Sequence, residues 1–216
     1  MVNPLVVTTF HVISPNASLL PSYSLMEPCE YELLRICDGS AIFRIHGNFL
    51  SRDLNTGSVG IVFGDMDDDE ASLSRIIVFE NLTVKYEHLE EPVVVVTDEG
   101  RRSSFNHSEV IVLRSAVAIQ VDVVAFDISI ELLKVPDSES LVVNVTVSEE
   151  LVTLCGLCGD IGGQLVFRDT GVLADLSDPG QVRAFIESWR VPTDRWLLRD
   201  QSLECGKCVC VCVCSL

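Results

Sequence analysis

The stretch Cys155-Gly156-Leu157-Cys158-Gly159-Asp160 decides how this chain is interpreted, together with the downstream segment Phe185-Ile186-Glu187-Ser188-Trp189-Arg190-Val191. Two cysteines separated by two residues admit three interpretations: a redox pair, half of a zinc site, or structural cysteines bonded to each other or to other parts of the domain. A thioredoxin-like catalyst places this motif at the start of a helix, whereas the glycines at 159, 162 and 163 indicate a turn. In an oxidising compartment the structural interpretation is favoured.

The sequence upstream of this motif has the pattern of β-structure. Runs rich in β-branched residues are separated by turn signals such as Asp38-Gly39 and Pro136-Asp137. The expected strands are 29–35, 41–46, 59–63, 74–86, 93–97, 109–113, 117–124, 126–133 and 141–147. A polar loop is expected at 51–60 and a solvated acidic loop at 65–70, whose spacing does not match an EF-hand. The fold class is therefore all-β, as an antiparallel sandwich or barrel.

One short helix is expected near the C-terminus, over residues 181–189. Ser177-Asp178-Pro179 supplies a cap and a proline suited to the first turn. The apolar residues that share one face of this helix are Val182, Phe185, Ile186 and Trp189. Phe185 and Trp189 are expected to pack the helix on the sheet, because a tryptophan is more often a core anchor than a binding platform.

Two flanking segments differ from the rest of the chain. Residues 1–28 are expected to be irregular, because their prolines break regular elements. Residues 206–216 alternate cysteine with valine, which is what a TG dinucleotide repeat read in frame encodes, so we expect a gene-model artefact there. The domain is therefore placed at residues 29–205.

Composition narrows the class of protein. With 15 basic and 32 acidic residues the net charge is −17, which repels phosphate backbones and excludes nucleic acid as a partner. No apolar run reaches the roughly 20 residues that span a membrane. Nine cysteines and four N-x-S/T sequons indicate a secreted, extracellular glycoprotein. The acceptor residues of these sequons are Asn16, Asn81, Asn106 and Asn144. Since no signal peptide is evident, we expect a piece of a longer secreted protein.

Catalytic motifs are missing from the sequence. The histidines stand in no motif with a nucleophile; they are His11, His46, His88 and His107. No nucleophile elbow, HExxH motif, dinucleotide fingerprint or P-loop is present. We therefore expect a protein that is not an enzyme.

Several blocks, in the right order, resemble the von Willebrand factor type D (VWFD) domain. Cys29-Glu30-Tyr31-Glu32-Leu33 is similar to the family's C-x-Y-x-L strand, and the CGLCG turn with its downstream F-x-x-SW-x-V segment is similar to the family's closing part. The resemblance covers residues 29–205 and implies an antiparallel sandwich-like domain with one short helix. The family's opening GDPH-x-x-TFDG strand has no counterpart, so the domain looks truncated at its N-terminal strand.

The resemblance also implies disulfides and a possible ion site. Cys29 is expected to pair with Cys205, and Cys158 to be free or to pair with Cys155 or Cys37. Since nine is odd, at least one thiol is unpaired or intermolecular. The resemblance implies no required cofactor, but it allows calcium, for which Asp160 and Asp169 are the candidate ligands.

The function implied by the resemblance is structural. It is that of an interaction module in a larger matrix, mucin-like or adhesive glycoprotein, which contacts other extracellular proteins or other copies of itself, or assembles through disulfides. Two alternatives stay open. One is thiol–disulfide exchange by Cys155 and Cys158 during multimer assembly, and the other is the type D domain of a lipid-carrier protein.

Overall fold

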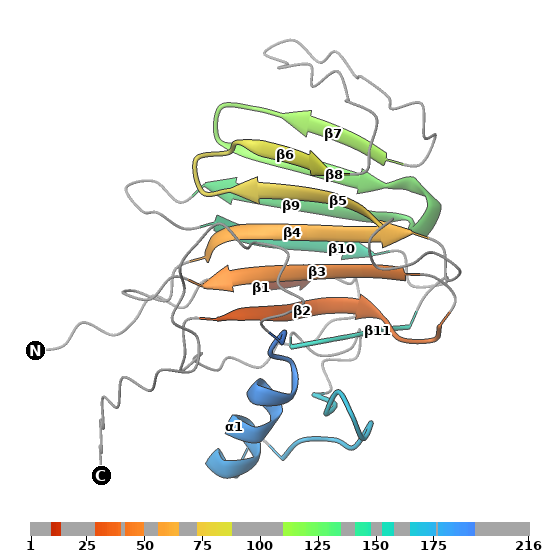
Figure 1. Cartoon of the computed structure of the whole chain (residues 1–216), viewed down its shortest axis with the longest axis vertical. Helices are drawn as coiled ribbons and strands as arrows, with labels where there is room; N and C mark the ends of the chain where they lie inside the picture. Colours follow the sequence, from red (N-terminus) through yellow and green to blue (C-terminus); the bar gives the residue numbers. More distant parts are fainter. Residues whose placement is uncertain are drawn as a thin grey trace, which may run out of the picture.

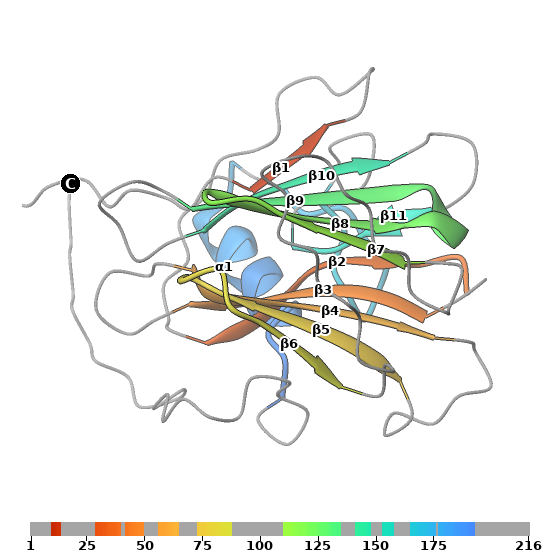
Figure 2. The same cartoon turned by 90° about the horizontal axis from the view of Figure 1, so that it is seen from above.

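The strands of this protein form two sheets that face each other, as its computed structural model shows (Figures 1 and 2). The structure describes residues 10–13, 29–39, 42–49, 56–64, 73–87, 110–134, 141–147, 153–157, 165–175 and 177–192. Within these ranges, all strand pairs except β1–β10 are antiparallel. The expected all-β, sandwich-like fold with one short helix is confirmed. The expected strand at 93–97 lies outside the described residues.

The first sheet, sheet A, has the strand order β1-β10-β9-β8-β7. Its strands are β1 (Phe10–Ile13), β7 (Val110–Arg114), β8 (Ala118–Val123), β9 (Ile128–Lys134) and β10 (Leu141–Val147), with a short 3-10 helix, η1 (Val124–Phe126), between β8 and β9. Burial alternates along β8 and β9, as expected for strands with one face in the core.

Strand β1 corrects the expectation that residues 1–28 are irregular. It runs parallel to β10, with Phe10 opposite Val143 and Ile13 opposite Thr146. No proline lies within Phe10–Ile13, so every residue of this short run keeps the backbone N–H that a ladder needs.

The second sheet, sheet B, has the order β11-β2-β3-β4-β5-β6. Its strands are β2 (Glu30–Ile36), β3 (Ile42–Phe49), β4 (Thr56–Gly64), β5 (Ser74–Phe79), β6 (Val84–Glu87) and β11 (Leu154–Cys155). The turn between β2 and β3 has Gly39 at φ 75°, which confirms the turn expected at Asp38-Gly39.

Two expected boundaries in sheet B are wrong. The expected strand 74–86 is two strands, because a turn at Glu80-Asn81 folds β6 back onto β5. The Asn81 side chain accepts a hydrogen bond from the Thr83 N–H (2.8 Å), and Leu82, at φ 61°, is buried beneath the turn. The expected polar loop 51–60 ends early, since β4 begins at Thr56.

The core lies between the sheets. Phe43 of sheet B meets Phe126 of η1 with ring centroids 5.8 Å apart. Helix α1 (Pro179–Ser188) lies at the β2 edge of the sandwich (Figures 1 and 2). Its N-cap Asp178 accepts from the Gly180 N–H, and Phe185 and Trp189 are buried as expected. No helix among the described residues is long and apolar enough to cross a membrane.

The outer edge of β2 is covered by two late segments of the chain. β11 pairs with its C-terminal half, and Arg190 bridges to Tyr31. The Glu32 N–H donates to the Trp189 carbonyl (2.9 Å), and the Val191 N–H donates to the Glu30 carbonyl (2.9 Å). We call residues 165–175 and 177–192 the C-terminal lobe. The backbone groups that an edge strand leaves open are thus satisfied on β2.

Candidate functional site

The CGLC turn is joined to β2 by a disulfide between Cys37 and Cys155. Their Cα atoms are 6.0 Å apart, although 118 positions separate them in sequence. The bond lies where β11 pairs with the end of β2, beside the Cys37 N–H that donates to the Thr153 carbonyl (2.8 Å). The expectation that this protein contains disulfide bonds is confirmed. Pairing of Cys158 with Cys155 or with Cys37 is wrong, because Cys37 and Cys155 bond to each other.

The first glycine of the CGLC turn is required by a close approach of two backbones. Gly156 has φ 156°, and a Cβ placed there would lie 2.3 Å from the Leu33 carbonyl oxygen. Leu33 is at a β-bulge, where the β2–β3 register shifts between Glu32 and Leu34. The next residue, Leu157, is buried and donates its N–H to the Glu32 carbonyl (3.2 Å). The turn is therefore positioned by its contacts with the bulge and by the Cys37–Cys155 disulfide.

A second disulfide begins at Cys29, immediately before β2. The other described cysteines bond to each other, so the partner of Cys29 lies outside the described residues. The predicted site residues Cys158, Cys205 and Asp160 also lie outside the described residues. The Cys29–Cys205 pairing thus stays a prediction.

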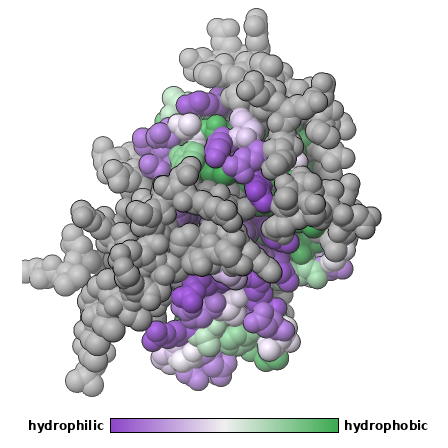
Figure 3. Space-filling model, viewed as in Figure 1, coloured by the Kyte–Doolittle hydropathy of each residue, from purple (hydrophilic) through white to green (hydrophobic). Residues whose placement is uncertain are grey.

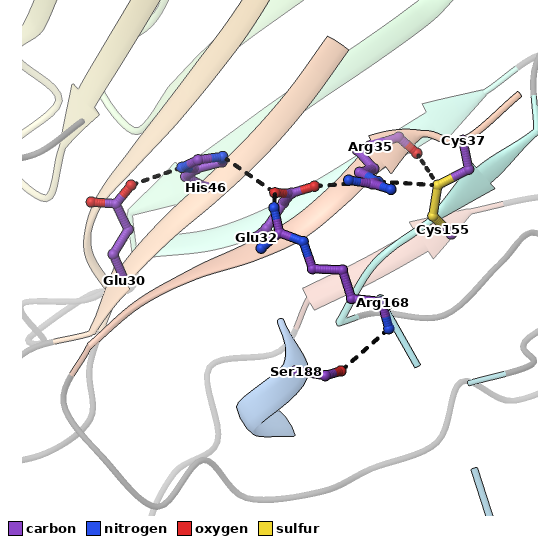
Figure 4. Close-up of polar contacts among 8 residues, drawn as sticks. All are labelled: Glu30, Glu32, Arg35, Cys37, His46, Cys155, Arg168 and Ser188. Atoms are coloured by element: carbon purple, nitrogen blue, oxygen red, sulfur yellow. Dashed lines mark hydrogen bonds and ion pairs between the residues drawn. A yellow bond between two sulfur atoms is a disulfide. The ribbon is translucent and has the colours of Figure 1, made fainter. Parts of the chain in front are cut away.

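Beside this disulfide, the outer face of sheet B carries a buried group of charged side chains (Figure 4). The register pairs Glu32 with His46 and Glu30 with Asn48, so these four side chains share one face. Phe43 and Ile45, which alternate with them on β3, belong to the core between the sheets. The outer-face polar residues are at most 4% exposed; they are Glu30, Glu32, His46, Asn48 and Ser58.

His46 lies between the two carboxylates. Its Nδ1 is 2.7 Å from Glu30 Oε1, and its Nε2 is 4.0 Å from Glu32 Oε2. Burying ionised groups is costly unless opposite charges and hydrogen bonds compensate them. The three side chains are therefore buried together, with the His46–Glu30 contact as the short one.

The C-terminal lobe supplies one of the two arginines that lie beside Glu32. Arg168 Nη2 is 3.0 Å from Glu32 Oε2, while Arg35 Nε approaches Glu32 Oε1 at 3.5 Å. Both guanidinium groups lie over the Trp189 ring, at 5.9 and 5.6 Å from its centroid. Arg35 Nε also donates to Cys37 Sγ (3.4 Å), which connects the charge cluster to the disulfide (Figure 4). We call the buried Glu30, Glu32 and His46, together with the half-buried Arg168 that contacts Glu32, the buried charge cluster.

The other predicted site residues are separate from this cluster. Asp169 is exposed in the turn 168–170, and the described part of the chain contains no group of three His, Cys, Asp or Glu residues placed to hold a metal. Asn81 is exposed at the β5–β6 turn, and Asn144 on β10 donates to Glu131 Oε2 (3.0 Å). Asn16 and Asn106 lie outside the described residues.

Sequence reasoning missed the buried charge cluster. His46 was set apart as a histidine without a motif, although it lies opposite Glu32 across the first hairpin. One signal was present, because two glutamates alternate within the apolar run Cys29-Glu30-Tyr31-Glu32-Leu33. Their burial depends on the lobe, which lies more than 130 residues further along the chain.

No protein-family model matches this chain, and no curated protein matches it either. The likeness to the VWFD domain therefore stays an expectation drawn from the sequence motifs.

Proposed function

We propose that this chain is an extracellular, disulfide-held interaction module of the VWFD kind, within a larger secreted glycoprotein. The observation that carries the proposal is the Cys37–Cys155 disulfide, which closes the late CGLC turn onto β2. The second disulfide, at Cys29, supports it. Disulfides of this structural kind form and persist in oxidising compartments and are rare in the cytosol.

Cysteine count supports assembly through further disulfides. The two disulfides use four of the nine cysteines and leave an odd number. At least one thiol therefore has no intrachain partner, and an odd cysteine in a secreted protein suggests a bond to a second chain or a free thiol. We propose self-assembly or attachment to another extracellular protein through such a thiol.

The C-terminal lobe offers a surface for non-covalent contact. Val172 and Leu173 are 60% and 57% exposed, next to each other in the hairpin that precedes α1. An apolar area among polar ones is visible over the lobe (Figure 3). Exposed apolar surface with a polar rim is a feature of protein contact sites.

The proposal is tested by secretion of the full chain behind an added signal sequence. We expect an oxidised glycoprotein, modified at Asn81, that runs as covalent dimers or larger species on non-reducing gels and as monomers after reduction. A chain that is stable only when reduced in the cytosol, or a secreted chain that is wholly monomeric and retains a reactive thiol, would contradict it.

The non-covalent part of the proposal has its own test. Leu173→Asp is expected to weaken the association of two chains. Analytical sedimentation measures it on protein whose free thiols have been blocked, so that no covalent dimers form. Val117→Asp is the matched control, because Val117 is equally exposed (62%) but lies in the β7–β8 turn. Equal behaviour of both variants would exclude the lobe surface. Calcium binding, exchange by Cys155 and Cys158, and a lipid-carrier role stay predictions of the sequence.

A further inference from the structure

The hairpin that precedes α1 in the C-terminal lobe is a short antiparallel ribbon. Val166 and Leu173 face each other as its bridge. The two hydrogen bonds of this bridge are made by the neighbouring residues, from the Phe167 N–H to the Val172 carbonyl (2.9 Å) and from the Ala174 N–H to the Leu165 carbonyl (2.7 Å). Val166 and Leu173 are therefore a non-hydrogen-bonded pair, whose own N–H and C=O groups point away from the hairpin on opposite sides.

The two edges of the hairpin differ in what satisfies these groups. The Val166 carbonyl accepts a hydrogen bond from the Trp189 indole N–H (3.1 Å), so this edge is turned toward the lobe's own interior. The N–H and C=O of Leu173 form no hydrogen bond with another described residue. The side chains of Val172 and Leu173 are also mostly exposed. We call residues 172–174 the open edge.

The open edge is held in place before any partner arrives. The Phe167 ring packs edge-on against Phe185 of α1, with centroids 6.1 Å apart. At the end of the hairpin the Asp175 N–H donates to Gln181 Oε1 of the same helix (3.1 Å). An edge that is already fixed loses little conformational entropy on binding. Unpaired strand edges of this kind are templates for a further strand.

We propose that the open edge pairs with the same edge of a second copy of this chain, antiparallel across a twofold axis. This inference rests on the proposed function and names the partner of the lobe surface. Leu173 then lies opposite its own copy, and the two residues exchange both of their open N–H···O bonds. The two hairpins become one continuous antiparallel ribbon, and each copy uses the same surface.

The side chains along the open edge suit a second copy. In this register the two Leu173 side chains lie next to each other on one face of the ribbon, as an apolar cross-strand pair. Val172 lies opposite Ala174 of the second copy. Asp175 is the only charged residue in 171–175, and it lies opposite Gly171 of the second copy. The pairing therefore brings no two carboxylates face to face, although the chain as a whole is strongly acidic.

Sedimentation of thiol-blocked protein tests the pairing through Leu173→Pro. Proline removes the N–H at this position, which no described intrachain bond uses. Two symmetric hydrogen bonds are lost, so the dissociation constant of the dimer is expected to rise about tenfold or more. Leu173→Val keeps the N–H and is the control, expected to stay within about threefold of wild type. Equal dissociation constants for the two variants would overturn the inference.

The behaviour of the wild-type chain separates this inference from the proposed function. Thiol-blocked wild type that stays monomeric would overturn edge pairing, while covalent multimers of the unblocked chain would still support the proposed function. Each copy carries a net charge of −17, so added salt is expected to strengthen the association by screening repulsion. Association that weakens with salt would indicate a basic partner segment instead, and would overturn the pairing of two copies.

A cross-link tests the register directly and does not depend on the proline variant folding. Opposed residues of a hydrogen-bonded antiparallel pair have Cα atoms about 5.5 Å apart, which a disulfide can span. Leu173→Cys is therefore expected, after mild oxidation, to give a peptide joined to its own copy through position 173. Val117→Cys, at an equally exposed position in the β7–β8 turn, is the control and is expected to give no such peptide. Dimers without the bond at position 173 would overturn the inference.

Discussion

The outer faces of the two sheets differ in how far they are exposed to solvent. On sheet A, polar side chains such as Gln120, Asp122 and Ser129 lie on the outer face, partly exposed, and bond to one another. On sheet B, the residues of β2, β3 and β4 are buried on both faces almost throughout, including two glutamates and a histidine. Sheet A is a half-solvated sheet, whereas this part of sheet B is an interior layer.

This difference explains where covalent bonds and charges gather. The described cysteines all lie in or beside sheet B, and the lobe covers its β2 edge. An interior layer with carboxylates on one face needs fixed partners, and the lobe supplies Arg168. Polar side chains on a half-solvated face need no fixed partner, because they can form hydrogen bonds with water.

The largest expected effect on the free energy of unfolding comes from removing the disulfide of sheet B. Replacing Cys37 and Cys155 together by serine removes a cross-link between residues 118 positions apart, which is expected to lower the free energy of unfolding by about 4 kcal/mol. Denaturant unfolding of the oxidised protein measures it. A loss below about 1 kcal/mol would show that the Cys37–Cys155 disulfide contributes little to the stability of the fold.

Next in size is a pair of matched substitutions, one on each outer face. Glu32→Gln leaves the half-buried Arg168 and the buried His46 without their carboxylate and is expected to cost about 3 kcal/mol. Glu131→Gln, on the exposed face of sheet A, is expected to change the free energy of unfolding by less than about 0.5 kcal/mol. Similar losses in chemical denaturation would remove the distinction between the sheets.

A smaller effect is expected at the bulge under the CGLC turn. Gly156→Ala places a Cβ against the Leu33 carbonyl and is expected to cost about 2–3 kcal/mol. Gly171→Ala is the control, because Gly171 also has positive φ (66°) but no atom within 4 Å of the added Cβ, so only about 1 kcal/mol is expected. Thermal unfolding at fixed pH compares the two, and equal losses would mean that the close approach is absent.

The smallest effect concerns Glu87 on β6, the other edge of sheet B. Burial pushes the pKa of Glu87 upward, but hydrogen bonds and charges of Lys85 and Arg75 outweigh it and hold that pKa below its usual value. A carboxyl with a lowered folded pKa stabilises the fold above its unfolded pKa, and this contribution is lost as pH falls through the folded value. Glu87→Gln is therefore expected to cost a few tenths of a kcal/mol at pH 7 and nothing at about pH 3. A cost that persists at acid pH would contradict the ion pairs.

Sequence reasoning succeeded where the signal is local. The strands of sheet A, the Asp38-Gly39 turn and α1 with its Asp178 cap follow from local patterns, because alternation, positive φ and capping are properties of neighbouring residues. Two elements were not predicted. The pairing of β1 with β10 joins residues more than 130 positions apart. The 3-10 helix η1 (Val124–Phe126) takes up the adjoining ends of the strands expected at 117–124 and 126–133.

Sheet B could not be predicted to the same depth. Near the turn the register pairs Arg35 with Arg44, and continued without change it would place Gly47, not His46, opposite Glu32. The bulge at Leu33 shifts the register by one residue and thereby brings His46 to Glu32. Gly156 lies against that bulge, and the next residue, Leu157, donates its N–H to the Glu32 carbonyl; no local pattern in β2 predicts either contact. The pairing of Cys37 with Cys155 is likewise fixed only by the meeting of β2 with β11.

The most direct test of the account is the native disulfide map of the secreted chain, made by mass spectrometry under non-reducing conditions with cleavage at Leu157 to separate Cys155 from Cys158. The account predicts a peptide pair joined through Cys37 and Cys155. A Cys155–Cys158 bond, or reduced thiols at both Cys37 and Cys155 in the folded protein, would contradict it.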